Sequence, residues 1–82
     1  MANNHELETR PIVLEGKSTS LRVELIYWVV IDEMARAAKL TRDQFLAVLK
    51  ARQPDDCNSL ASWVRVFVTC ALRKRLRDLK VA

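Results

Sequence analysis

The stretch Lys17–Glu24, with the sequence KSTSLRVE, limits the fold more than any other part of the chain. It has the pattern of a short strand, and an apolar helical segment follows it with no linker. Alternate residues of a strand point to opposite faces, so Thr19, Leu21 and Val23 share one face. The opposite, polar face carries Ser18, Ser20 and Arg22.

A single strand cannot satisfy its own backbone hydrogen-bonding groups, and a bare two-stranded ribbon is only marginally stable in water. The strand therefore needs both a second strand and a hydrophobic layer. In a chain of 82 residues that is otherwise helical, the simplest partner is the same strand of a second copy, paired antiparallel. We therefore expect a mostly α-helical fold, in which one short strand pairs across a homodimer and three helices follow.

An intrachain hairpin is the alternative. The segment Arg10–Leu14 is suited to a short edge strand, where Pro11 is tolerated, and Gly16 supplies a turn. If Ile12–Leu14 folded back on Leu21–Val23, an intersubunit ribbon would be unnecessary.

The length and composition indicate one small domain. Half of the residues are apolar, which is typical of a folded chain. We expect residues 1–9 to form a flexible arm and residues 10–82 to form the domain. The longest apolar run, Leu25–Ile31, is shorter than the roughly 20 residues that span a bilayer, and the amino terminus lacks an apolar signal core. These features predict a cytoplasmic protein in which Cys57 and Cys70 are reduced thiols.

Three helices are predicted from periodicity and capping signals. The first covers Leu25–Ala38. The second begins at Thr41, which forms a capping-box pattern with Gln44, and the third begins near Asn58 or Ser59. The large aromatic residues fall in phase with apolar helix faces, so we expect core packing rather than base stacking. They are Trp28, Trp63 and Phe67.

The formal net charge is +4, which favours polyanionic partners. The basic residues crowd the carboxyl-terminal segment, which could track a DNA backbone, bind an acidic protein or be the solvated side of a helix. Its apolar phase through Leu72, Leu76 and Leu79 is needed for protein packing, which argues against a membrane role. The cations of this segment are Arg65, Arg73, Lys74, Arg75, Arg77 and Lys80.

Catalysis finds no support in the sequence. The one histidine, His5, lies in the expected arm, and there is no Ser-His-acid grouping or glycine-rich phosphate loop. Nothing would activate a nucleophile or hold a cofactor. We therefore expect no enzyme activity, catalytic residue, metal or cofactor.

The order of these segments resembles the ribbon-helix-helix DNA-binding family, in particular a bacterial branch with an additional third helix. The resemblance covers Arg10–Leu76. The matching stretches are Gly16 with KSTSLRVE, Tyr27 and Trp28, LTRDQFLAVLKAR, and NSLASWVRVFV.

The resemblance implies that two subunits pair their strands and insert the ribbon into the major groove of duplex DNA. It makes Ser18, Ser20 and Arg22 the base-contacting residues. It assigns phosphate contacts to Lys17, Thr41 and Arg42, the last two at the start of the second helix. It further implies a homodimeric transcriptional repressor or autoregulator. The alternative is a helical protein-interaction module, possibly antitoxin-like, that binds a partner protein through its basic C-terminal helix.

Two residues depart from the family pattern. Ser18 stands where the family has an arginine, which leaves Arg22 as the only cation of the base-facing set. Lys39 occupies the turn between the first two helices, where glycine is usual. A lysine there predicts a strained or differently built turn.

Overall fold

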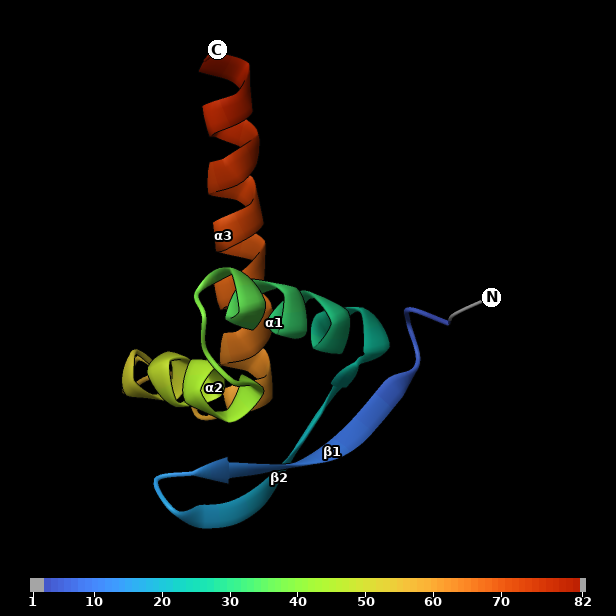
Figure 1. Ribbon diagram of the computed structural model, residues 1–82, viewed down its shortest axis with the longest axis vertical. Helices are drawn as coiled ribbons and strands as arrows, with labels where there is room; N and C mark the ends of the chain where they lie inside the picture. The colour runs from blue at the N-terminus through green and yellow to red at the C-terminus, as the bar shows by residue number, and fades with distance from the viewer. Residues whose placement is uncertain (1–2, 82) are drawn as a thin grey trace.

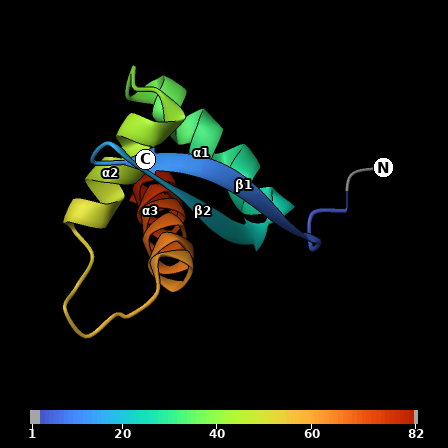
Figure 2. The ribbon, with the colours of Figure 1, turned by 90° about the horizontal axis from the view of Figure 1, so that it is seen from below.

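The computed structural model describes residues 3–81 of the chain, and the side chains of residues 3–79. Two strands, β1 (Leu7–Leu14) and β2 (Lys17–Glu24), precede α1 (Leu25–Ala37), α2 (Arg42–Ala51) and α3 (Leu60–Val81). The strands form a hairpin at one end of the molecule, and the carboxyl-terminal half of α3 projects from the other end (Figure 1). Viewed from below, both strands cross in front of the helices, between α1 and α3 (Figure 2).

The sheet corrects the prediction of one strand that pairs only across a homodimer. Strand β2 has the expected bounds, but it pairs antiparallel with β1 of the same chain. The connection is the two-residue turn Glu15–Gly16, whose φ angles of 53° and 77° are those of a tight type I′ hairpin turn. The observed arrangement is thus the intrachain hairpin. Its first strand, Leu7–Leu14, is longer than the segment Ile12–Leu14 that the sequence suggested for this pairing.

The first strand reaches into the segment expected to be a flexible arm, since β1 begins at Leu7. The residues before it cover the start of α1. The backbone N–H of Leu25 donates to the Glu6 carbonyl at 2.8 Å, and that of Ile26 to the Asn4 carbonyl at 3.2 Å. The first N–H groups of a helix have no partner inside the helix, so these carbonyls supply one. Of the expected arm, Met1 and Ala2 lie outside the described residues.

The hydrophobic core lies between the inner face of the hairpin and the three helices. Trp28 is fully buried, and Trp63 and Phe67 pack against the core, which confirms their predicted role. Phe67 meets both Phe45 and Trp63 edge-on. The buried residues are Ile12, Leu21, Val23, Trp28, Ile31, Ala35, Phe45, Leu46, Leu49, Val64 and Val68.

The turn from α1 to α2 has the geometry that a glycine usually provides. Lys39 has a φ of 60°, in the left-handed region that costs a side chain energy. Its N–H donates to the Arg36 carbonyl at 3.0 Å, and the Leu40 N–H donates to the Ala35 carbonyl at 2.9 Å. This pair of bonds is a Schellman motif. The turn is therefore built normally, with lysine in the strained position.

The predicted capping box at the start of α2 is confirmed. The Gln44 N–H donates to the Thr41 hydroxyl at 3.2 Å, and the Thr41 N–H donates to the Gln44 side-chain oxygen at 2.9 Å. The third helix begins similarly, since the Ser59 hydroxyl accepts from the Ser62 N–H at 3.2 Å. Both starts follow from local sequence alone.

Helix α3 changes character along its length. Its first half buries Val64 and Val68, whereas Leu72, Leu76 and Leu79 are exposed. The apolar period continues as predicted, but α3 extends beyond α1 and α2 (Figure 1). We call residues 72–79 the distal half of α3. None of the described helices is long and apolar enough to cross a membrane, and Cys57 and Cys70 are free thiols.

Candidate nucleic-acid interface

One face of the hairpin points away from the core and gathers exposed side chains from both strands. The three predicted base-contacting residues all lie on it, and each has a partner directly opposite on β1. All six side chains are exposed. We call this set the outer face; its cross-strand pairs are Ser18 with Val13, Ser20 with Pro11, and Arg22 with Thr9.

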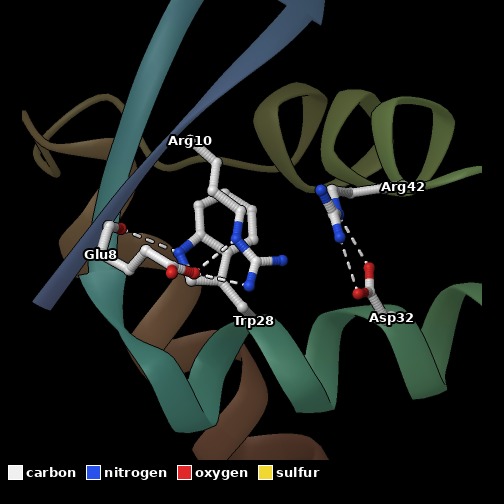
Figure 3. A network of polar contacts seen from close by, with 5 residues as sticks. All are labelled: Glu8, Arg10, Trp28, Asp32 and Arg42. Atoms are coloured by element: carbon white, nitrogen blue, oxygen red, sulfur yellow. Dashed lines mark hydrogen bonds and ion pairs between the residues drawn. The ribbon is translucent and has the colours of Figure 1, made fainter. Parts of the chain in front are cut away.

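Contacts on the inner face of β1 determine which side chains of this strand point to solvent on the outer face. The indole N–H of Trp28 donates to the Glu8 carbonyl at 2.9 Å. The Arg10 guanidinium lies 5.0 Å from the centre of the Trp28 ring and forms an ion pair with Glu8, as Figure 3 shows. A cation over an indole ring is attracted by the ring's negative face. The polar residues Glu8 and Arg10 can therefore lie on the inner face of β1, and these contacts hold the register between β1 and β2.

A second ion pair involves Arg42, which the resemblance assigned to phosphate. Its guanidinium donates two hydrogen bonds, of 2.8 and 2.7 Å, to the two carboxylate oxygens of Asp32 on α1, as Figure 3 shows. These bonds hold the pKa of Asp32 below its ordinary value and raise the pKa of Arg42. The two bonds use Nε and one terminal nitrogen of Arg42, so its charge is already matched by Asp32 before any phosphate binds.

The other expected phosphate contacts lie in different surroundings. The Thr41 side chain is occupied by the capping box. Asp43, in the first turn of α2, accepts a hydrogen bond from the Val13 N–H at 3.3 Å. A carboxylate there competes with an incoming phosphate for the positive end of the helix dipole. The backbone N–H groups near Thr41 therefore remain at the start of α2, but the Asp43 carboxylate partly offsets the positive end of the helix dipole there.

Lys17 lies beside the hairpin turn, in an open depression that also includes Lys50 of α2. Sequence analysis missed Lys50, because nothing in the pattern of α2 indicates that it lies near the hairpin tip. The two ammonium groups give this end of the hairpin a positive charge. The other residues that line the depression are Leu14, Glu15, Thr19, Ser20 and Leu60.

The basic C-terminal segment divides into two parts. Arg65 donates to the Glu24 carboxylate at 2.9 Å, so it joins α3 to the end of β2, and this bond lowers the pKa of Glu24. The other exposed cations belong to the distal half of α3, which extends away from the hairpin (Figure 1). They are Arg73, Lys74, Arg75 and Arg77. The outer face, whose one cation is Arg22, and the distal half are therefore two separate surfaces that carry positive charge.

The fold and this arrangement agree with comparison to known proteins. The family model of the ribbon-helix-helix domain matches residues 7–72, so the chain belongs to the ribbon-helix-helix family. Domains of this family are generally DNA-binding regulators without enzyme activity. The predicted family is thus confirmed.

A solved structure shows the same fold. It is an uncharacterized protein from Bordetella pertussis Tohama I, which aligns with a TM-score of 0.64 at 23% sequence identity over 94% of this chain. The alignment covers 62% of that protein, less than two thirds of its length. Among curated proteins, no sequence matches this chain.

Proposed function

We propose that this protein binds duplex DNA through the outer face of its hairpin and acts as a small transcriptional repressor or autoregulator. The observation that carries the proposal is the exposed line of Ser18, Ser20 and Arg22 along β2. An arginine can donate two hydrogen bonds to guanine O6 and N7, and a serine hydroxyl can donate to or accept from any base edge. Such a regulator would act in the cytoplasm of a bacterium.

The sheet leaves room for the predicted homodimer. Each strand of a two-stranded sheet keeps one unpaired edge. The free edge of β2 contains no proline, whereas Pro11 gives β1 one N–H group fewer. A second copy that paired antiparallel along β2 would give the strand order β1–β2–β2–β1. The outer faces of both copies would then lie together around a two-fold axis and read two related half-sites.

The test is selection of bound sequences from a random duplex DNA pool, run for the natural protein and for Arg22→Ala. We expect a two-fold symmetric motif, and a loss of about 1–3 kcal/mol of specific binding free energy per Arg22 contact. Arg77→Ala, on the projecting end of α3, is the matched control and should keep the motif. An Arg22→Ala variant with unchanged specific affinity would refute the assignment of base contacts to the outer face.

Phosphate contacts are proposed for Lys17, for Arg42 and for the backbone around Thr41. Loss of a phosphate contact weakens binding to all sequences alike and reduces the steepness of the salt dependence. The charge of Arg42 is already matched by Asp32, so Arg42 should contribute less to phosphate binding than Lys17. Lys17→Ala should therefore lower affinity more than Arg42→Ala. The opposite order would mean that the ion pair with Asp32 does not limit the contribution of Arg42.

The distal half of α3 favours the second candidate function, docking of a partner protein. Its exposed leucines at positions 72, 76 and 79 form a stripe beside a cluster of cations, on the end of the molecule away from the hairpin. Charge complementarity favours an acidic amphipathic helix as the occupant. Leu76→Glu should abolish capture of such a partner and leave DNA binding unchanged. If the variant changes DNA binding instead, this surface serves the DNA complex.

A further inference from the structure

We infer that β1 supplies half of the base-reading surface, and that Val13 and Thr9 read bases beside the residues of β2. This inference rests on the proposed function and adds apolar base contacts to the polar contacts made by β2. Arg22 and the serines offer only polar contacts, whereas Val13 offers methyl groups. An apolar side chain in the major groove recognises the 5-methyl group of thymine.

The strand register places these side chains. Val13 lies opposite Ser18, and Thr9 lies opposite Arg22. Side chains directly opposite in an antiparallel pair point to the same face, roughly 4.5–5.5 Å apart. A ligand that touches Ser18 and Arg22 therefore also meets Val13 and Thr9.

The anchoring of β1 fixes which of its faces is exposed. A slip of one residue would exchange the two faces completely. The bond from Trp28 to the Glu8 carbonyl and the bond from the Val13 N–H to Asp43 hold the strand at two points. Ile12, the neighbour of Val13, is buried in the core. Val13 is thus held outward at 45% exposure.

The dimensions of the hairpin suit the major groove. Two strands lie roughly 4.8 Å apart, and the groove is about 12 Å wide. The pairs that contain Val13 and Arg22 are separated by four residues of β1, which is roughly 14 Å of strand. With a rise of about 3.4 Å per base pair, the thymine read by Val13 should lie roughly four base pairs from the guanine read by Arg22.

This surface is complete within one chain, because β1 and β2 belong to the same hairpin. If β2 also pairs with a second copy, β1 forms the outer strand on each side. The outer strands of such a four-stranded sheet lie roughly 14 Å apart, which exceeds the groove width of about 12 Å. The contacts of Val13 and Thr9 are therefore inferred for the hairpin of one chain entering the groove.

The test removes the thymine methyl group from the DNA and the two terminal methyl groups of Val13 from the protein. Affinity is measured for the sequence selected by the natural protein, and for the same duplex with uracil in place of the thymine. The variants are Val13→Ala, Thr9→Ala and the control Val29→Ala, which changes an α1 valine that is also 45% exposed. Unfolding curves are recorded for each variant to check that it folds.

We expect the natural protein and Val29→Ala to bind the uracil duplex about fourfold more weakly, the effect of one methyl group removed from water. Val13→Ala, which keeps only the β-methyl group, should discriminate between the two duplexes less than Val29→Ala does. Thr9→Ala should relax the base preference beside the guanine. If Val13→Ala discriminates as strongly as Val29→Ala while Arg22→Ala loses the motif, β1 does not read bases and the proposed function stands. If no variant alters any motif, the proposed function and this inference both fail.

Discussion

The two strands of the hairpin differ in how closely burial follows the apolar pattern. In β2 the apolar residues Leu21 and Val23 are buried, and Ser18, Ser20 and Arg22 are exposed. In β1 the inner face carries Glu8 and Arg10 beside the buried Ile12, while Leu7 and Val13 are exposed. The difference shows that a strand can be defined by its contacts with another element, even where its own pattern argues against it.

The contact that makes β1 possible is Trp28. Its ring supports the Arg10 guanidinium, and its N–H satisfies the Glu8 carbonyl. Buried or half-buried polar groups cost free energy unless they find such partners. Strand β2 needs no equivalent, because its inner face is apolar over Leu21 and Val23.

The largest predicted effect comes from removal of this support. Trp28→Ala should lower the free energy of unfolding by about 3–5 kcal/mol, because it empties a fully buried site. Trp28→Phe keeps most of the apolar contact but leaves the Glu8 carbonyl without its donor, at a cost of about 1–3 kcal/mol. Urea unfolding measures both. If neither substitution lowered the free energy of unfolding, β1 would not depend on this residue.

Within β1, neighbouring residues should differ sharply. Ile12→Ala should cost about 2–4 kcal/mol, because Ile12 is only 1% exposed. Val13→Ala should cost within about 0.5 kcal/mol, as is usual for the surface. Thermal unfolding of the two variants compares them directly. Equal costs would mean that β1 does not pack with the observed face inward.

Substitutions at the two turn positions Gly16 and Lys39, both at positive φ, should change stability through the backbone conformation. Gly16→Ala should destabilise the protein by about 1 kcal/mol, because Gly16 has a φ of 77° that a residue with a side chain rarely adopts. A Cβ there would meet no atom within 4 Å, so the cost comes from the backbone conformation and not from a steric clash. Lys39→Gly should act in the opposite direction by a similar amount, because Lys39 is a side-chain-bearing residue at positive φ. Chemical denaturation measures both. A stabilising Gly16→Ala would contradict the observed turn.

A similarly small effect is expected at the Asp32–Arg42 pair, whose side chains are each 34% exposed. Asp32→Asn should cost up to about 1 kcal/mol at neutral pH. Because the folded-state pKa of Asp32 is lowered, its contribution is full above the ordinary value of 3.8 and is lost as the pH falls below it. Unfolding curves of both proteins should therefore converge in acid. A difference that persisted there would mean that Asp32 stabilises the fold without its charge.

Local sequence predicted the features that depend on neighbouring residues. The capping box of Thr41 and Gln44 appeared as expected, as did the burial of Leu21 and Val23. The exposure of Ser18, Ser20 and Arg22 followed from the same alternation.

The remaining features depend on residues far apart in the chain. Strand β1 was underestimated because its support, Trp28, lies 20 residues from Glu8. The ion pair of Arg42 joins two helices, so spacing could not show that its charge is already matched. The addition of Thr9 and Val13 to the outer face likewise needed the register between the strands.

The most direct test of DNA binding by the outer face is a backbone-amide NMR titration of the natural protein with a selected duplex. We expect the largest shift changes in β1 and β2, with the distal half of α3 unaffected. The same spectra recorded with Arg22→Ala should show smaller changes in the hairpin. Shift changes confined to α3, with the hairpin unaffected, would contradict the account.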